Sequence, residues 1–241
     1  WAGFASLLRY VPTSAGPGGL HDAVRAAEKE LEDDPRAVRL LHYLSIPPAA
    51  AREVVTTLGE AGLAERARIV MEKPFGTDLE SARELNAHVQ SVFPEQAIFR
   101  IDHFLGKEAA LNILAFRFAN GLFEPIWNRQ HIDHVQIDVP ETLSIATRAA
   151  FYESAGAFRD MVVTHLFQIL AFVAMEPPTA LEPRAINEEK NKVFRSMVPI
   201  ASTDVVRGQF AGYRDLEGVA PESQTDTFVA LRCHIDNWRW A

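Results

Sequence analysis

The sequence predicts two domains in series, an α/β domain with a parallel sheet over residues 1–104 and an α+β domain over residues 105–241. Three observations support this division. Up to about residue 101, helical patterns alternate with short apolar runs, which is typical of strand–helix–strand units. After Asp102 this alternation stops, and a long apolar helix is followed by strand-like runs. A length of 241 residues suits one large domain or two smaller ones.

The elements of the first domain follow from apolar spacing and from residues that begin or end helices. Helices are predicted at His21–Leu31, at Ala49–Gly62, and from the capping residue Asp78 to about Val92, and strands at Val38–Ile46, Arg68–Met71 and Gln96–Ile101. The run Gly16-Pro17-Gly18-Gly19 lacks the spacing of a dinucleotide-binding glycine motif and is interpreted as a loop.

The second domain contains helices first and strands later. Helices are predicted at Gly106–Phe118 and Gly156–Met175, and strands at His134–Val139, Asp204–Phe210 and Phe228–Ile235. The helix Gly156–Met175 is apolar on most sides, so we expect it to be buried. The mixed run Glu188-Glu189-Lys190-Asn191-Lys192 is interpreted as a solvated helix face.

Composition excludes several classes of function. A formal charge of −8 argues against a general nucleic-acid binder. A single cysteine, Cys233, rules out an internal disulfide and a cysteine metal cluster and suits the reducing cytoplasm. No run of about 18 apolar residues is present, so no membrane span is expected. The histidines show no metal-ligand spacing, and no metal is expected.

The turn Glu72-Lys73-Pro74-Phe75-Gly76 is a first candidate site, because ligands of open α/β sheets lie beyond the carboxyl ends of strands. A lysine there can meet a phosphate, a carboxamide or a sugar hydroxyl. The plainer interpretation is a strand-exit turn with a solvated lysine, and the turn taken alone favours it.

The segment from Arg100 to Glu108 is a second candidate, where a strand leads into a helix. Helix N-termini present free N–H groups and suit a phosphate, and His103 and Lys107 flank this one. Neighbours in an extended chain point to opposite faces, so we expect Asp102 and His103 to serve different sites. Spacing alone leaves open a simple helix start capped by Asp102.

The long apolar helix carries a third candidate, a polar stripe of Asp160, Thr164, His165 and Gln168 within an arc of roughly 140° at about 100° per residue. Buried polar groups without partners are costly, so this stripe needs partners. An imidazole beside a carboxylate can act as a general base near neutral pH. A hydrogen-bonded core histidine with no chemical role is the commoner case.

Taken together, these segments resemble the glucose-6-phosphate dehydrogenase family. Order and spacing agree from about residue 40 to the end. The matching segments are Tyr43 to Pro48, Glu72 to Gly76, Arg100 to Glu108, Arg159-Asp160 with His165, and Ala174 to Pro178.

The resemblance implies oxidation of β-D-glucose 6-phosphate to 6-phospho-D-glucono-1,5-lactone, with hydride transfer from C1 to NADP, the first step of the oxidative pentose phosphate pathway. It implies that His165 is the base that removes the C1 hydroxyl proton. Asp102 would hydrogen-bond that imidazole and stabilise the imidazolium. The fold it implies is part of a Rossmann-like NADP-binding domain, then an α+β dimerisation and substrate domain with a mainly antiparallel sheet.

The resemblance also assigns binding roles to other residues. The substrate side comprises His103 and Lys107 for the 6-phosphate, Glu141 and Asp160 for sugar hydroxyls, and Lys73. The cofactor side comprises Lys73, Tyr43 and Pro47. A cis Lys73–Pro74 bond is expected to position Lys73 between cofactor and substrate. A homodimer or dimer of dimers is implied, with no membrane or nucleic-acid partner.

Some family features are not found in this sequence. The family's glycine-rich phosphate loop has no counterpart, and the residues that read the cofactor's 2′-phosphate, which decide between NADP and NAD, are expected before Trp1. A further substrate lysine is expected after Arg239-Trp240. We interpret both chain ends as cuts through structured material, so a fragment lacking these parts is expected to be impaired. Phe104 and Thr164 stand where tyrosine and asparagine are common.

Two other functions are compatible with the same residues. Sugar dehydrogenases of the glucose–fructose oxidoreductase and inositol dehydrogenase type share the two-domain plan and a Glu-Lys-Pro turn, but act on unphosphorylated sugars. The pair His103 and Lys107 at a helix N-terminus favours a phosphate instead. A non-catalytic sugar-phosphate-binding fragment is the third possibility, and the joint presence of Lys73, Asp102 and His165 argues against it.

Overall fold

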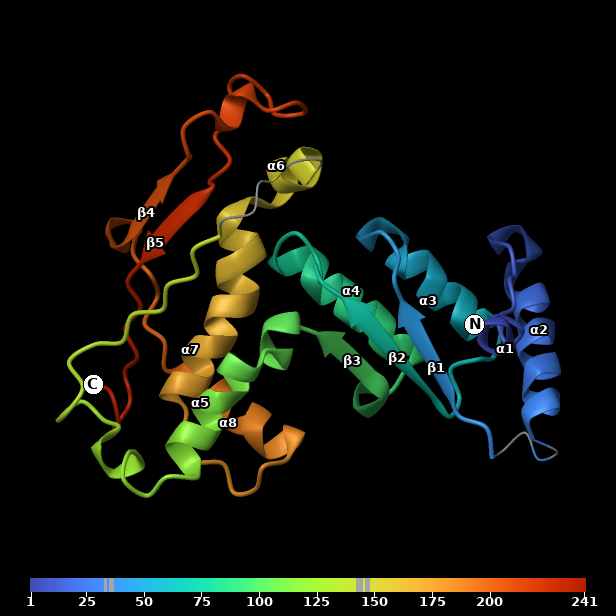
Figure 1. The fold of residues 1–241 in the computed structure, drawn as a ribbon, viewed down its shortest axis with the longest axis horizontal. Helices are drawn as coiled ribbons and strands as arrows, with labels where there is room; N and C mark the ends of the chain where they lie inside the picture. The colour runs from blue at the N-terminus through green and yellow to red at the C-terminus, as the bar shows by residue number, and fades with distance from the viewer. Residues whose placement is uncertain (33, 35–36, 142–144, 146–147) are drawn as a thin grey trace. The chain divides into compact units, whose positions relative to one another are not determined.

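The computed structural model describes residues 1–32, 34, 37–141, 145 and 148–241, which form two compact units (Figure 1). The first unit is Trp1–Ile101 and the second is Asp102–Ala241. The units divide between Ile101 and Asp102, whereas the sequence placed the domain boundary after residue 104.

The first unit is built on a parallel sheet of three strands, β1 (Leu40–Leu44), β2 (Ala67–Glu72) and β3 (Ile98–Ile101), in the order β1-β2-β3. Both pairings are parallel, with Leu40 opposite Ala67 and Ile69 opposite Ile98. Each predicted strand is present with slightly different ends, and the predicted parallel α/β fold is confirmed.

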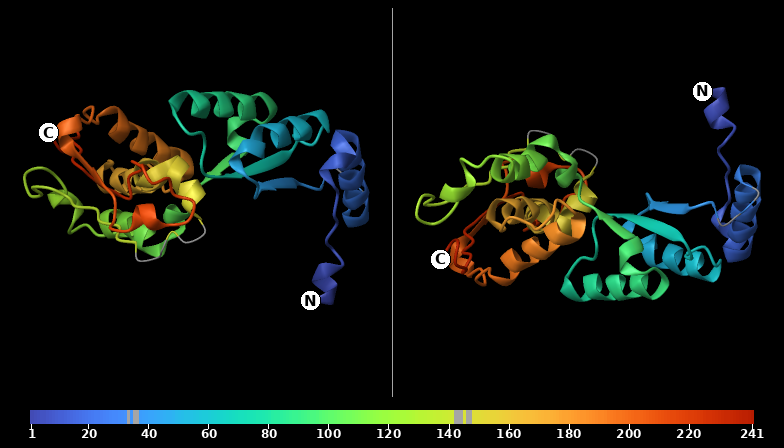
Figure 2. Two further views of the ribbon diagram at one scale, coloured as in Figure 1. Left: turned by 90° about the horizontal axis from the view of Figure 1, so that it is seen from above. Right: turned by 90° about the horizontal axis from the view of Figure 1, so that it is seen from below.

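Helices α2 (Gly16–Leu31), α3 (Ala51–Glu60) and α4 (Leu79–Val92) accompany this sheet. Both crossovers, through α3 and α4, advance the sheet in the same direction. Right-handed connections therefore place both helices on the same face, as Figure 2 shows. The core between them buries Val55, Leu58, Ile69, Met71 and Val89. The carboxyl ends of β1 and β2 are thereby held side by side.

The short elements of the first unit are α1 (Ala2–Ala5), η1 (Thr13–Ala15), η2 (Pro48–Ala50) and η3 (Glu95–Ala97). The run Gly16 to Gly19, interpreted as a loop, instead forms the first turn of α2, so that interpretation was wrong. Proline is tolerated in the first turn of a helix because its missing N–H would have no intrahelical partner there.

Asp78 is the N-cap of α4, as the sequence predicted, and it forms a capping box with Ser81. Its carboxylate accepts a hydrogen bond from the Ser81 backbone N–H at 2.8 Å, and the Ser81 hydroxyl accepts one from the Asp78 N–H at 3.1 Å. We expect Asp78→Ala to lower the free energy of unfolding by about 1 kcal/mol, because the Ser81 N–H in the first turn of the helix loses its acceptor. Urea unfolding followed by circular dichroism measures this change. Asp22→Ala, in the exposed interior of α2, is the control, and an equal loss there would contradict the role of the cap.

The second unit contains helices first and an antiparallel pair of strands later. Its main elements are α5 (Glu108–Phe118), α6 (Ala149–Ala157), the π-helix η7 (Phe158–Leu166), α7 (Phe167–Ala174), α8 (Pro183–Arg195), β4 (Val205–Gly208) and β5 (Phe228–Leu231). Short 3-10 helices are η4 (His103–Gly106), η5 (Glu124–Ile126), η8 (Ser202–Asp204) and η9 (Tyr213–Asp215). Strands β4 and β5 pair antiparallel, and α7 packs against both α5 and α8 (Figure 1).

The predicted strand His134–Val139 was wrong, because this segment is in no strand or helix. The segment alternates apolar and polar residues as a strand would, but within the described part of the chain no strand pairs with it. Sheet structure needs a partner as well as a pattern, and alternation alone does not supply one.

The last carbonyls of α7 are satisfied by side chains from elsewhere. Arg117 donates to the Phe172 and Met175 carbonyls at 2.7 and 2.8 Å. Trp127 donates to Val173 at 2.7 Å, and Trp240 donates to Ala174 at 2.8 Å. The last carbonyls of a helix lack intrahelical partners, and here those of Phe172, Val173, Ala174 and the C-cap residue Met175 each accept a side-chain bond. The end of α7 is thus fixed within the second unit.

One helix in the described residues, Phe151–Ala174, is long and apolar enough to cross a membrane by length and composition alone. The sequence showed no sign of this helix as a membrane span, because Arg159 and Asp160 interrupt its apolar run. Core helices of soluble proteins pass the same test. In this helix the buried residues concentrate in the final turns, where Phe172 and Ala174 join a hydrophobic core. The test is therefore weak evidence for a membrane role.

Candidate active site

The centre of the site is a hydrogen bond between Asp102 and His165, which are 63 residues apart in the chain. Nδ1 of His165 lies 2.5 Å from Oδ1 of Asp102. A carboxylate only accepts, so Nδ1 carries the hydrogen and the lone pair of a neutral ring lies on Nε2. The expected contact between these two side chains is confirmed, and it gives a buried imidazole with an acidic neighbour.

The two partners come from different local structures. Asp102 follows β3 and caps η4, where Oδ1 also accepts the Phe104 N–H at 3.0 Å. His165 lies in the π-helix η7, whose wider turn replaces the regular spacing assumed for the polar stripe. π-helical segments occur often at functional sites. The helix that carries His165 thus departs from α-helical geometry at the residue of interest.

The start of that helix is fixed from a distant part of the chain. The carboxylate of Asp226 accepts the Phe158 N–H at 2.8 Å, and the Asp226 carbonyl accepts the Ala157 N–H at 2.8 Å. Gly156 has a φ of 69°, and a side chain there would meet the Asp226 carboxylate at about 3.3 Å. The glycine is needed because the chain turns through positive φ directly against this cap.

Two basic side chains, His103 and Lys107, lie beside the Asp102–His165 pair. The ring of His103 lies 4.6 Å from the ring of His165, and the ring of Phe104 stacks on His165 at 4.1 Å between centroids. Nζ of Lys107 lies 3.7 Å from the centre of the Phe104 ring. His103 and Lys107 are exposed, and Lys107 is the residue that precedes α5. Two cationic or titratable groups and a helix N-terminus therefore gather beside the buried imidazole.

The expectation that Asp102 and His103 serve different sites was wrong. Asp102 hydrogen-bonds His165, and His103 contacts the same ring. The chain leaves β3 and enters the tight turn of η4 at this point, so the alternation of an extended strand no longer applies.

The structure does not bring every other predicted polar residue into contact with the Asp102–His165 pair. The Thr164 hydroxyl donates to the Asp160 carbonyl at 2.8 Å, so it is satisfied within its own helix. Asp160 is half-buried, and its charge contributes to the raised pKa of Tyr152, whose main cause is burial. Glu141 is exposed and lies next to residues 142–144, which are outside the described residues.

The predicted cofactor residues lie in the first unit, at the carboxyl ends of neighbouring strands. Tyr43 is the next-to-last residue of β1, and its hydroxyl donates to Glu72 at the end of β2. That contact raises the pKa of Tyr43. Pro47 follows β1, Lys73 follows β2, and the predicted cis Lys73–Pro74 bond is confirmed. These side chains line the edge at which parallel sheets bind ligands.

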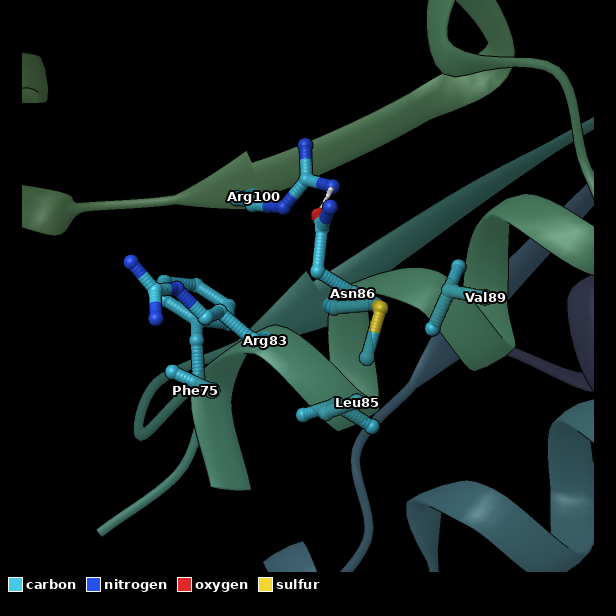
Figure 3. A pocket seen from close by; sticks show the side chains of 8 residues that line it. Phe75, Arg83, Leu85, Asn86, Val89 and Arg100 are labelled. Carbon is cyan, nitrogen blue, oxygen red and sulfur yellow. Dashed lines mark hydrogen bonds between the residues drawn. The ribbon is translucent and has the colours of Figure 1, made fainter. Parts of the chain in front are cut away.

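A cavity of about 310 Å³ lies in the first unit against α4 (Figure 3). Its walls include Met71, Leu85 and Val89, and two further lining residues, Arg100 and Asn86, are hydrogen-bonded to each other. A second hollow, of about 400 Å³, lies around Glu176 and Arg239 in the second unit. His165 lines neither of them and is 1% exposed. The site is therefore recognised by the buried imidazole and its acidic neighbour, and neither of these two cavities marks it.

Lys190 is the residue that the sequence interpretation missed. Glu189 and Lys190 are 8% and 7% exposed, so the solvated face expected for residues 188–192 was wrong at these two positions. Ile186, Lys190 and Val193 are spaced as i, i+4 and i+7 on α8, which is the spacing of a buried stripe. That spacing was the available signal.

These features define a class of two-domain proteins, in which a parallel α/β unit of the nucleotide-binding type precedes an α+β unit with a histidine–carboxylate pair. Family models then match nearly the whole chain. Residues 1–112 match "Glucose-6-phosphate dehydrogenase, NAD binding domain", and residues 114–241 match "Glucose-6-phosphate dehydrogenase, C-terminal domain". The chain belongs to the glucose-6-phosphate dehydrogenase family, as its motifs indicated.

Individual relatives agree with this assignment. The chain is 45% identical over 254 residues to glucose-6-phosphate 1-dehydrogenase of Rhizobium meliloti, covering 99% of the chain and 50% of the relative. It is 44% identical over 263 residues to glucose-6-phosphate 1-dehydrogenase 2 of Mycobacterium tuberculosis, covering 100% of the chain and 50% of the relative. The chain thus spans about half the length of the curated relatives it matches.

Solved structures give the same result. The crystal structure of glucose-6-phosphate 1-dehydrogenase from Mycobacterium avium matches with a TM-score of 0.84 and 45% identity, over 93% of this chain and 48% of that one. A glucose-6-phosphate dehydrogenase in complex with its substrate glucose-6-phosphate matches with a TM-score of 0.85 and 34% identity, over 96% and 50%. The predicted combination of a parallel sheet and a separate antiparallel sheet is that of the family.

Proposed function

We propose that this chain is part of an enzyme that oxidises D-glucose 6-phosphate to 6-phospho-D-glucono-1,5-lactone with hydride transfer to NADP, the first step of the oxidative pentose phosphate pathway. The observation that carries the proposal is the Asp102–His165 hydrogen bond, with His103 and Lys107 beside it. Membership of the family supports it. Spectroscopic detection of NADPH formation, with a protein of full family length, tests it.

In this mechanism His165 accepts the C1 hydroxyl proton on Nε2. Asp102 holds Nδ1–H, so the ring presents the correct nitrogen and the imidazolium that forms is stabilised by a carboxylate 2.5 Å away. A nicotinamide cofactor held at the carboxyl ends of β1 and β2 would supply the acceptor for the hydride that leaves C1. Burial of His165 excludes water from the proton transfer, which strengthens the interaction with Asp102.

The first unit has side chains that fit a dinucleotide. Tyr43, Pro47 and Lys73 gather at the carboxyl ends of two parallel strands, where such ligands bind. We assign them to the cofactor side. We place NADP there as the cofactor, since the family's domain is of the NAD-binding type.

The substrate side combines cations and hydroxyl acceptors. His103 and Lys107 at the start of α5 would bind the 6-phosphate, because both are exposed there and the first N–H groups of the helix favour an anion. Asp160, Glu141 and Lys73 are assigned to the sugar hydroxyls by the family resemblance. The phosphate assignment is the part that a binding measurement tests directly.

Lys107→Ala is expected to weaken glucose 6-phosphate binding by about tenfold to a hundredfold, because a charge-assisted bond to the phosphate is worth roughly 1.5–3 kcal/mol. Binding of glucose should change by less than about threefold. Isothermal titration of both sugars measures the two effects. Lys192→Ala, on the exposed side of α8, is the matched control. Equal weakening of both sugars by Lys107→Ala would contradict the phosphate site.

The same measurement separates the second candidate function. A sugar dehydrogenase of the glucose–fructose oxidoreductase and inositol dehydrogenase type would bind glucose as well as glucose 6-phosphate. The exposed pair His103 and Lys107 beside the imidazole favours the phosphorylated sugar. A cytoplasmic location and a homo-oligomer are part of our proposal and rest on the family resemblance.

A further inference from the structure

One oxygen of the buried Asp102 carboxylate has no hydrogen-bond partner among the described residues. Oδ1 accepts two hydrogen bonds, from His165 and from the Phe104 N–H, whereas Oδ2 is buried and accepts none. A buried carboxylate oxygen without compensation is costly, so this position calls for a donor or a positive charge.

A buried lysine on α8 is a candidate for that positive charge. Lys190 on α8 is 7% exposed, and its Nζ lies 5.3 Å from the centre of the Phe172 ring on α7. Burial lowers the pKa of Lys190, and the charge of Asp102 acts in the opposite direction. Within the described residues no salt bridge joins Lys190 to a carboxylate, and its neighbour Lys192 is the partner of Glu189. A buried ammonium needs an anion nearby, and Asp102 is the carboxylate that acts on it.

We propose that Lys190 is a positioning residue for the Asp102–His165 pair, in which its ammonium compensates the charge at Oδ2 of Asp102 through one buried water. Oδ1 is then left to face Nδ1 of His165. The inference deepens the proposed function, and it assigns a role to a side chain that touches neither substrate nor cofactor. The Phe172 ring, on the helix that continues from His165, holds the ammonium in place by a cation–π contact.

The charge of Lys190 predicts the direction of a pH effect. Among the described residues, Asp102 and His103 contact His165, and Lys107 lies over the adjoining Phe104 ring. Asp160 is on η7 itself, and Lys190 on α8 interacts with Asp102. A positive charge near the pair disfavours the imidazolium. Removing it lets the ring keep its proton to higher pH, so less of the base form is present at low pH.

The test compares three variants. Lys190→Met keeps the length of the side chain and removes the charge, Lys190→Arg keeps the charge, and Lys192→Met removes an exposed charge from the same helix. The first readout is the ¹⁵N titration of the His165 ring in this chain. The second is the pH profile of kcat/KM in a protein of full family length.

In Lys190→Met we expect the His165 titration and the low-pH limb of kcat/KM to move to higher pH by roughly one pH unit. Lys190→Arg should restore most of the shift, and Lys192→Met should leave both readouts in place. A folded Lys190→Met protein with an unmoved His165 titration overturns the inference. The NMR readout needs no turnover, so a failure of the proposed function is seen separately as absent NADPH formation.

A second measurement covers the case in which Lys190→Met does not fold. The ¹⁵Nζ resonance of Lys190 is followed in the unchanged chain and in Asp102→Asn. A change in the Lys190 titration toward lower pH supports the contact, because the ammonium loses its counter-charge. An unchanged Lys190 resonance overturns it.

Discussion

Replacing His165 by asparagine is expected to lower kcat for NADP reduction by about three orders of magnitude, in a protein of full family length, while glucose 6-phosphate affinity changes by less than about threefold. Asparagine approximates the size and Nδ1–H donor of histidine, so Asp102 keeps a partner. It cannot accept the C1 proton. Steady-state kinetics measures the first effect and equilibrium titration of the sugar phosphate the second.

The surface offers a matched control for this variant. His134 also pairs with an aspartate, Asp133, at 2.9 Å, but its side chain is 75% exposed. His134→Asn should leave kcat within about twofold, because a solvated pair contributes little. If His165→Asn reduced sugar-phosphate binding as much as turnover, the histidine would be structural and the proposed mechanism would be wrong.

Replacing Arg117 by methionine is expected to lower the free energy of unfolding of the second unit by roughly 3 kcal/mol or more. Arg117 is fully buried, donates to two carbonyls at the end of α7, and pairs with Glu124 at 3.2 Å. Burial lowers the pKa of Arg117 to about 10, so it is charged at neutral pH. Methionine would leave those carbonyls without donors.

Urea unfolding followed by tryptophan fluorescence checks this expectation, because the Trp127 ring lies 5.4 Å from the Arg117 guanidinium. Arg184→Ala is the control. Arg184 pairs with Glu188 four residues along α8, and its side chain is 91% exposed, so the expected loss is about 0.5 kcal/mol or less. Similar losses for the two arginines would show that the end of α7 does not depend on Arg117.

Much of the first unit could be predicted from the sequence because its signals are local. The capping box at Asp78 and the apolar runs of β1 and β2 are each read within a few residues. The run Gly16 to Gly19 was misinterpreted because composition suggested a loop where a proline-bearing first turn was equally allowed. Segment His134–Val139 shows the converse, since its pattern was right for a strand but pairing is not local.

The site was predicted through motifs more than through geometry. Asp102 and His165 were joined by family resemblance, and the structure brings them together. The π-helix around His165 and the capping of its helix by Asp226 have no short-range signature. Lys190 was misread because a charged residue in a charged run suggests solvent, although its helical spacing with Ile186 and Val193 pointed inward.

The helix that carries His165 is fastened at both ends by residues made much later in synthesis. Asp226 holds its start across 68 residues of sequence, and Trp240 holds its end across 66. Long-range contacts of this kind slow folding, because loop closure must precede the gain from the contact. When His165 has just been synthesised, the residues that bond the two ends of its helix, Asp226 and Trp240, have not yet been added to the chain. The imidazole is expected to reach its final place only when the strand pair and the last tryptophan have emerged.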